Sequence, residues 1–328
     1  MSILAGCSAS SGDADETSDA GASTNPGDSS DASSLDSSAS AEASAEATTE
    51  TTTEDSTGDA TGDGDGDGDG DGDDDGDPSC KRGIAYGYHS LADMQALSPA
   101  VSWWYNWSPR PDEAVAETHP QAGFEFVPMV WGGQFDAGAI SAGIRDDATS
   151  LLGFNEPNFH SQANIPAADA AALWPQLEAI ADAHQLRLIS PAVNFCGGGC
   201  WDTDPFSYLD DFLAACDGCR IDAIAAHWYA CDGPALEWYL GELAKYELPI
   251  WLTEFSCGDG ADLSLPVQLA YMEEALAILE ADPNVERYAW FAGRTDVIPN
   301  VSLLAADGEL TELGQLYVSA PALGDCPP

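Results

Sequence analysis

Eight apolar segments of strand length recur between residues 82 and 293, and they alternate with segments of helical character. The apolar segments cover residues 82–89, 101–107, 123–131, 150–157, 186–194, 221–229, 249–255 and 285–293. Strands that are apolar almost throughout and alternate with helices are typical of a parallel sheet covered on both faces. Eight such strands in about 250 residues predict an α/β fold of the (β/α)8 TIM-barrel type, one domain over residues 80–328.

The helical periodicity is clearest in residues 266–282, where four apolar side chains recur at steps of three and four: Leu269, Met272, Leu276 and Leu279. A second helix is expected over residues 172–184, with Pro175 kinking it or opening its main part. The competing architecture is an open sheet with helices on both faces. The chain lacks the GxGxxG and GxxxxGK[ST] patterns of the nucleotide-binding versions of that architecture, which favours the barrel.

The first 80 residues have a different composition from the rest. They contain no Lys, Arg, His or aromatic residue, yet they hold 22 of the 57 acidic residues. Such a segment cannot bury enough apolar surface to offset its chain entropy, so we expect a disordered linker over residues 8–79. The remaining residues carry 35 acidic and nine basic side chains, a net charge of −26 out of −48. This charge argues against nucleic acid as a partner.

The chain begins MSILAGC, and Leu-Ala-Gly-Cys resembles the lipobox of bacterial lipoproteins. Residues 1–7 are therefore interpreted as a truncated lipoprotein signal, with Cys7 as the lipidated residue, although a charged region and a full apolar region are missing before it. The alternative is an accidental match. The lipobox predicts an extracellular or cell-surface protein, attached to the membrane through Cys7.

The eight remaining cysteines are an even number, which suggests disulfide bonds in an exported protein: Cys80, Cys196, Cys200, Cys216, Cys219, Cys231, Cys257 and Cys326. We expect Cys80 and Cys326 to join the ends of the domain, and Cys196 and Cys200 to close a short Gly-rich loop. The CxxC of residues 216–219 has no second pair at zinc-site spacing, so it is interpreted as structural and no metal site is predicted.

Two glutamates stand at the ends of the fourth and seventh apolar segments, Glu156 in LLGFNEPNF and Glu254 in PIWLTEF. Catalytic side chains of a (β/α)8 barrel lie at the C-terminal ends of its strands. Alternate residues of a strand share a direction, so Glu156 is expected to point with Leu152 and Phe154, and Glu254 with Ile250 and Leu252. Each glutamate taken alone could be a turn or capping residue; the pair predicts two carboxylates in the barrel mouth.

Two carboxylates facing one cleft suit the cleavage of a glycosidic bond. One protonates the leaving oxygen, and the other attacks the anomeric carbon or activates a water. A separation of about 5–5.5 Å would mean retention and one of roughly 6.5–9.5 Å inversion, a distance that the sequence leaves open.

Polar and aromatic residues at other strand ends are candidates for binding the substrate. His227 and Tyr229 lie two residues apart on the sixth strand, where they could support the carboxylates; the alternative is an ordinary core pair. Aromatic faces suit the C–H faces of sugar rings. We therefore assign to the cleft Tyr105, Asn106, Trp107, Trp131 and Trp290.

Several of these segments resemble the motifs of glycoside hydrolase family one hundred and twenty-eight, the alkali-sensitive-linkage-protein-like catalytic domain. The matching stretches, from Lys81 to about Tyr317, are RGIAYG, WWYNW, FVPMVWG, GFNEPN, AAHWYAC, WLTEFSC and YAWFAGR. The resemblance implies a (β/α)8 barrel and retaining cleavage of β-1,3-glucan. It also implies that Glu156 is the acid/base, that Glu254 is the nucleophile and that Asn155 contacts the sugar 2-hydroxyl. We expect no cofactor.

Other functions remain open from the sequence. The chain could cleave another β-linked polysaccharide, or it could be a catalytically silent carbohydrate-binding barrel on the cell surface. Residues 63–74 match the start of a D-x-D-x-D-G calcium loop, but a solvated spacer is the simpler interpretation of an Asp-Gly repeat. A monomer is expected.

Overall fold

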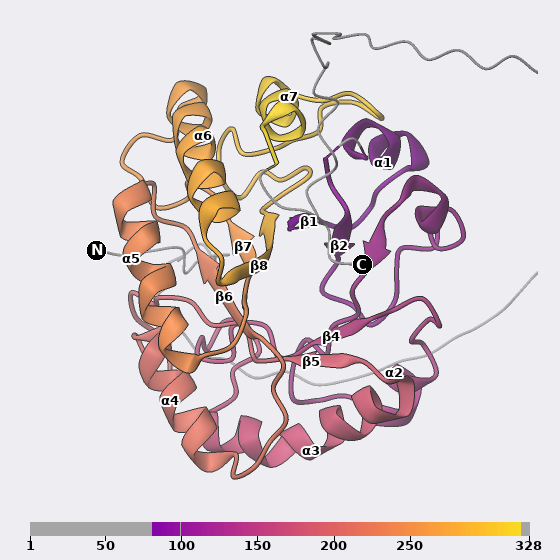
Figure 1. The fold of residues 1–328 in the computed structure, drawn as a ribbon, viewed down its shortest axis with the longest axis vertical. Coiled ribbons are helices and arrows are strands. Elements are labelled where there is room, and N and C mark those ends of the chain that lie inside the picture. Colours follow the sequence, from indigo (N-terminus) through magenta and orange to yellow (C-terminus); the bar gives the residue numbers. More distant parts are fainter. Residues whose placement is uncertain (1–80, 99, 323–328) are drawn as a thin grey trace, which may run out of the picture. The chain divides into compact units, whose positions relative to one another are not determined.

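The computed structural model describes residues 81–98 and 100–322, and within them eight parallel strands form a barrel surrounded by helices (Figure 1). The predicted (β/α)8 fold is confirmed. The lipobox cysteine Cys7, the linker, the Asp-Gly repeat and the expected Cys80–Cys326 bridge lie outside the described residues.

The strands all fall inside the predicted apolar segments but are shorter than those segments. They are β1 (Arg82–Ala85), β2 (Trp103–Tyr105), β3 (Glu125–Phe126), β4 (Ser150–Leu152), β5 (Arg187–Ile189), β6 (Ile224–Trp228), β7 (Ile250–Phe255) and β8 (Val285–Trp290). Six strands pair in the order β3-β2-β1-β8-β7-β6, and β4 pairs with β5. Single parallel bridges, Met129 with Leu152 and Ile189 with Ala223, connect the two sets and complete the ring.

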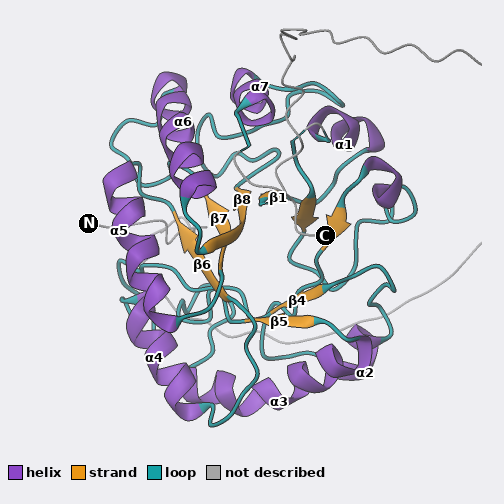
Figure 2. Ribbon diagram, in the orientation of Figure 1, coloured by secondary structure: helices purple, strands orange, loops and turns teal. Residues whose placement is uncertain are grey.

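A helical element follows every strand, as Figure 2 shows in purple around the orange strands. The elements are α1 (Leu91–Leu97), η1 (His119–Ala122), α2 (Ala137–Ser141), α3 (Ala167–His184), α4 (Pro205–Ala215), α5 (Gly233–Leu243), η2 (Ala244–Tyr246), α6 (Leu265–Ala281) and α7 (Glu312–Ser319). Asp204 and Asp232 cap α4 and α5 by accepting a backbone N–H, and proline follows within the first turn of each helix. Pro175 lies inside α3, which begins at Ala167, so it does not open that helix.

The buried apolar residues form two groups. One contains twelve residues on or next to the strands, among them Trp103, Trp251 and Met129, and it fills the barrel interior. The indoles of Trp103 and Trp251 approach to 5.4 Å between ring centroids. A Cβ at Gly83 would lie 2.3 Å from the Trp103 ring, so glycine is required there. The other group lies between the strands and the helices, where α3 and α6 contribute Leu177, Leu276 and similar residues.

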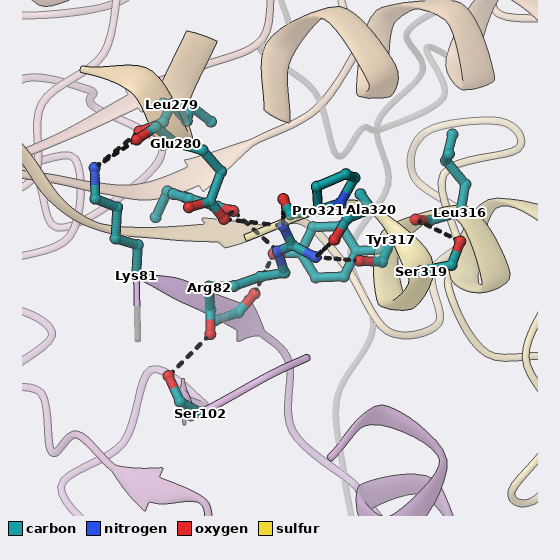
Figure 3. Close-up of polar contacts among 12 residues, drawn as sticks. Lys81, Arg82, Ser102, Leu279, Glu280, Leu316, Tyr317, Ser319, Ala320 and Pro321 are labelled. Atoms are coloured by element: carbon teal, nitrogen blue, oxygen red, sulfur yellow. Dashed lines mark hydrogen bonds and ion pairs between the residues drawn. The ribbon is translucent and has the colours of Figure 1, made fainter. Parts of the chain in front are cut away.

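A buried polar network joins the start of β1 to the last elements of the chain (Figure 3). Fully buried Arg82 donates to Glu280 of α6 at 2.9 Å, to the Tyr288 hydroxyl of β8 at 2.9 Å and to the Tyr317 carbonyl of α7 at 2.7 Å. Lys81 donates to three backbone carbonyls at the end of α6, those of Leu279, Glu280 and Asp282. These contacts hold the first strand against the end of the domain.

Three disulfides lie in the described part of the chain. Cys196–Cys200 closes the Gly-rich loop after β5, as expected, and Cys216–Cys219 is a disulfide rather than half of a zinc site. The third, Cys231–Cys257, joins the segments that follow β6 and β7. Its two ends stand close to Tyr229 and Glu254, so it ties together the two strands that carry site residues.

Candidate active site

A cleft of about 390 Å³ opens at the C-terminal ends of the strands, and both predicted glutamates line it. This volume falls in the usual range of ligand pockets, roughly 300–1,000 Å³. The cleft is lined by Trp107, Trp131, Asn155, Glu156, Phe159, Ser161, Gln162, Asn194, Tyr229, Glu254, Phe291, Val297 and Ile298.

Glu254 reaches the cleft through an irregularity in β7 and not through simple alternation. Ile250 and Leu252 face the helices, whereas Trp251 fills the barrel interior. Strict alternation would therefore turn Glu254 toward the helices. The register shifts, however, so that Ala226 pairs with Leu252 and His227 pairs with Glu254, which leaves Thr253 as an extra residue. The bulge turns Glu254 inward, and the expectation that it points with Ile250 and Leu252 is wrong.

Glu156 also departs from the expected pattern. Leu152 lies in the barrel interior, but Phe154 packs in the outer group against Trp174 of α3. β4 ends at Leu152, and Glu156 has a φ of 41°, in the left-handed region. The three side chains therefore do not share a direction, and a non-glycine residue held at positive φ is strained. The turn in the chain, together with Pro157 behind it, places the carboxylate in the cleft.

Glu254 is held by three neutral donors. The Tyr105 hydroxyl donates to Oε1 at 3.0 Å and the Trp107 indole N–H donates to the same oxygen at 2.8 Å. The Tyr229 hydroxyl donates to Oε2. Burial, reinforced by the charge of Glu254, raises the pKa of both tyrosines well above the usual value, so they remain donors. Glu254 therefore acts as an acceptor at both oxygens, in a fixed orientation.

Glu156 has a different set of partners. The Asn194 amide donates to Oε1 at 3.0 Å, and His227 Nδ1 lies 3.0 Å from the same oxygen. The same nitrogen lies 3.5 Å from Oε2 of Glu254, so one imidazole bridges the two carboxylates. Burial lowers the pKa of His227, but the charges of Glu254 and Glu156 outweigh it, and the net effect is a raised pKa. His227 thus couples the two acids.

The two acids lie close enough to act on one bond. One ligand atom from each of Glu156, His227 and Glu254 lies within 4.8 Å of the others, and all three residues are buried. Such a trio could hold a cation, and it is the one group of three or more potential metal-ligating side chains found among the described residues. The hydrogen bonds from tyrosine and tryptophan to Glu254, and from asparagine to Glu156 Oε1, orient the two carboxylates.

Within the described residues, the lysines and arginines do not form ion pairs with the two glutamates of the cleft. All nine lysines and arginines lie in the described part, and their ion pairs involve acids outside the cleft, such as Glu280, Glu286 and Asp93. The ion pairs of Glu156 and Glu254 in that part of the chain involve His227 alone. The carboxylates are therefore satisfied by neutral donors and one imidazole.

Of the residues predicted to bind substrate, Asn155, Trp107, Trp131 and Tyr229 line the cleft. Trp131 is 40% exposed, so its ring is open to a ligand. Asn155 is buried, and its Oδ1 has no partner among the described residues. A buried acceptor without a partner is costly unless a ligand supplies a donor. Tyr105 and His227 stand behind this wall, where they contact the glutamates.

Two predicted residues lie elsewhere. Trp290 is fully buried on the helix side of β8, where its indole donates to the Val301 carbonyl at 2.8 Å and packs on Phe255 and Tyr317. The alternation of β8 turns Ala289 inward and Trp290 outward, so Trp290 does not line the cleft. Asn106 lines a neighbouring hollow with Tyr88 and Asp112, and it donates to the Arg110 carbonyl at 3.1 Å.

Sequence reasoning missed Asn194 and Phe291. Asn194 ends the fifth apolar segment, so the strand-end argument applied to Glu156 would have found it. Phe291 follows β8 and presents its ring edge to Trp107 and Tyr229, with centroids at 6.0 and 5.8 Å. An aromatic residue just past a strand gives no signal that separates cleft from core.

Comparisons with known proteins identify the family of the chain. Residues 83–317 match the family described as the glycosyl hydrolase catalytic core. A GH128 (subgroup II) endo-β-1,3-glucanase from Sorangium cellulosum is 53% identical, with a TM-score of 0.70, over 75% of this chain and 100% of that chain. A GH128 (subgroup I) endo-β-1,3-glucanase from Amycolatopsis mediterranei, solved with laminaritriose, is 31% identical, with a TM-score of 0.60, over 73% of this chain and 99% of that chain.

A curated relative extends the comparison to a longer protein. Alkali-sensitive linkage protein 1 of Schizosaccharomyces pombe is 33% identical over 259 residues, 74% of this chain. The chain spans less than half of that relative, 45% of its length. The resemblance noted in the sequence motifs is thus confirmed: the chain belongs to the glycosyl hydrolase catalytic core family and, within it, to the GH128 glycoside hydrolases.

Proposed function

We propose that the protein is a retaining endo-β-1,3-glucanase that works by double displacement with two glutamates. Two of the similar solved structures are described as endo-β-1,3-glucanases, one of them in complex with laminaritriose. The observation that carries the proposal is that both acids line one cleft, with one oxygen of each within 4.8 Å of the other. This close approach suits a retaining pair, in which the nucleophile itself must reach the anomeric carbon.

In the first step Glu254 attacks the anomeric carbon while Glu156 gives its proton to the departing glycosidic oxygen. A covalent glycosyl-enzyme ester forms and the aglycone leaves with the proton. In the second step Glu156 takes a proton from water, the hydroxyl adds to the anomeric carbon, and Glu254 is released as carboxylate. Two inversions leave the β configuration.

The surroundings of the two acids support these different roles. Glu254 accepts hydrogen bonds at both oxygens from Tyr105, Trp107 and Tyr229, which orients it for attack. The contacts of Glu156 within the described structure converge on Oε1, from Asn194 and His227. His227 Nδ1 lies near both glutamates, so it can hydrogen-bond to whichever of them carries the negative charge after Glu156 gives up or takes back its proton.

The experiment that tests the proposal is product analysis by NMR on laminarin, with mannan, xylan and cellulose beside it. Release of β-configured oligosaccharides of mixed length from laminarin supports a retaining endo-β-1,3-glucanase. Initial α products would contradict retention, and monosaccharide alone would contradict endo action. Faster cleavage of mannan, xylan or cellulose would show that β-1,3-glucan is not the preferred substrate. Binding without cleavage would favour a carbohydrate-binding barrel.

Chemical rescue assigns the two acids separately. In Glu156→Ala an activated aryl β-glycoside still glycosylates Glu254, and azide then gives a β-glycosyl azide. In Glu254→Ala azide replaces the nucleophile and gives the α anomer. The opposite anomers would reverse the two roles.

We also propose that the protein is exported and held at the cell surface through Cys7. Three disulfides in the described residues support export, because such bonds persist in oxidising compartments. No helix in the described part of the chain is both long enough and apolar enough to cross a membrane. Metabolic labelling with a palmitate analogue, compared between the wild type and Cys7→Ser, tests the anchor.

A further inference from the structure

The loop closed by Cys196–Cys200 packs against the segment that connects β4 to α3. Phe159 and Cys200 form an antiparallel bridge, and the His160 N–H donates to the Gly199 carbonyl at 3.0 Å. The Trp201 N–H donates to the Asn158 carbonyl at 2.8 Å. The disulfide loop is thus fixed by backbone hydrogen bonds to the segment that carries part of the cleft wall.

Trp201, the residue after this loop, is exposed but held in place. Its side chain is 50% exposed, and its indole N–H donates to Asn164 Oδ1 at 2.9 Å. The His160 ring meets it edge-on, with centroids 4.7 Å apart, and His160 Nδ1 lies 3.1 Å from the same Asn164 oxygen. The apolar indole surface is not stabilised by contact with water. The backbone hydrogen bond to Asn158, the indole hydrogen bond to Asn164 and the ring contact with His160 fix its orientation before a ligand binds. Preorganised aromatic surface binds ligands at a low entropic cost.

Trp201 is hydrogen-bonded to a segment that also contributes residues to the cleft wall. Phe159, Ser161 and Gln162 line the cleft beside the two glutamates, and His160 lies between them in sequence. His160 is itself exposed and contacts Trp201. Sugars that leave the cleft along residues 159–162 would pass the segment to which Trp201 is hydrogen-bonded.

We propose that Trp201 and His160, held by the Cys196–Cys200 loop, form an outer platform that stacks on a glucose unit of a long β-1,3-glucan chain. The proposal rests on the proposed function and adds a site beyond the catalytic cleft. The indole face packs on the C–H face of a pyranose, while Asn164 holds the indole N–H. The platform would serve long chains, since Trp201 lies outside the set of residues that line the cleft.

The test compares kinetics on laminarin and on laminaritriose for the full chain, the Trp201→Ala variant and a matched control. The control is Trp238→Ala, which removes an indole of similar exposure, 52%, from α5, where it packs on Phe195 and Phe206. We expect Trp201→Ala to raise the ratio of KM on laminarin to KM on laminaritriose by about three- to tenfold, the range of one aromatic contact. Trp238→Ala is expected to leave that ratio at the wild-type value.

Two further variants separate the platform from a loss of folding. Trp201→Phe keeps a ring but loses the hydrogen bond to Asn164, so an intermediate ratio is expected. The pair Cys196→Ser and Cys200→Ser frees the loop and should shift the ratio in the same direction. Equal ratios for Trp201→Ala and Trp238→Ala would overturn the platform, and an unchanged ratio in the cysteine pair would overturn the role of the disulfide.

Failure of the platform can be told from failure of the proposed function. If the wild type cleaves neither glucan, the glucanase assignment fails whatever Trp201 does. Binding to insoluble curdlan by Glu254→Gln, with and without Trp201→Ala, is measured in the same series and needs no turnover. Equal retention of both proteins on curdlan would count against the platform, and weaker retention of the double variant would support it.

Discussion

Two buried polar networks occupy opposite ends of the barrel strands, and they handle negative charge differently. At the start of β1, Glu280 is paired with the guanidinium of Arg82 and also accepts from Tyr288. At the C-terminal ends, Glu156 and Glu254 share one imidazole and otherwise accept from neutral groups. All of these acids are buried, so exposure does not distinguish the two ends.

The two networks differ in their roles: the one around Arg82 stabilises the fold, and the one around Glu156 and Glu254 suits catalysis. A carboxylate clamped by a buried guanidinium has its charge balanced permanently, and removing one partner leaves an uncompensated charge. Carboxylates held by phenol, indole and amide groups are oriented but keep the capacity to attack or to exchange a proton. In barrels of this kind, the C-terminal face carries activity and the opposite face carries stability.

The largest effect is expected when the catalytic end is broken. Glu254→Gln should lower kcat by at least about 10⁴-fold, because the amide cannot attack the anomeric carbon. Thermal unfolding should stay close to that of the wild type, since the shape is retained. Exposed Glu237→Gln on α5 is the matched control, with activity unchanged. Substantial turnover by Glu254→Gln would remove Glu254 from the mechanism.

The next largest effect belongs to the other end. Arg82→Ala should cost about 3–5 kcal/mol of unfolding free energy, because Glu280 is left buried without its cation. Denaturant melts measure this, and the fraction that remains folded should keep its KM. Lys245→Ala, which breaks a surface pair with Asp210, should cost at most about 1 kcal/mol. Similar losses in both variants would show that burial of the Arg82 pair is unimportant.

A smaller effect is expected from the groups that donate hydrogen bonds to Glu254, the proposed nucleophile. Tyr229→Phe removes the hydroxyl that donates to Oε2 of Glu254, an oxygen that His227 approaches only to 3.5 Å, and should lower kcat by roughly 10–10³-fold with a small change in KM. Tyr105→Phe removes one of two described donors to Oε1 and should cost less. Steady-state kinetics give the loss of kcat in each variant, and the ratio of the two losses shows which tyrosine contributes more to orienting Glu254. A larger loss for Tyr105→Phe would reverse that account.

The smallest effect concerns pH. The raised pKa of His227, caused by the two glutamates against the opposing effect of burial, means that the folded protein holds this proton more tightly than the unfolded chain. The resulting stability is present below pH 6.5 and is lost as pH rises through the raised pKa. Unfolding melts from pH 6 upward should show this decline in the wild type. His227→Gln should show a flatter profile, and parallel profiles would contradict the raised pKa.

The sequence predicted the elements of the fold well, because strand and helix periods are local properties. The eight apolar segments each contain one strand, and the helix expected over residues 266–282 is α6. The Arg82–Glu280 pair could not be predicted, since the two residues are 198 positions apart and nothing local joins them. The disulfide Cys231–Cys257 was left among many possible pairings for the same reason.

The sequence predicted part of the candidate site, but the argument that oriented the two glutamates was wrong. Strand ends brought Glu156, Glu254, His227 and Tyr229 together, but the alternation used to aim the glutamates fails in both strands. Asn194 was within reach of the same strand-end argument. Trp290 was misplaced because an aromatic at a strand end can face either side, and only the register of β8 decides which.

The extra residue in β7 has a consequence for how this enzyme can change. Thr253 is the extra residue that decides which later side chains of β7 point into the barrel and which point to the helices. Deletion of Thr253 would therefore turn the Glu254 side chain toward α5 and α6, although the residue would still be a glutamate. Insertions and deletions in β7 are therefore predicted to be far more damaging than substitutions at Thr253 itself, a contrast that a deletion scan along the strand would reveal.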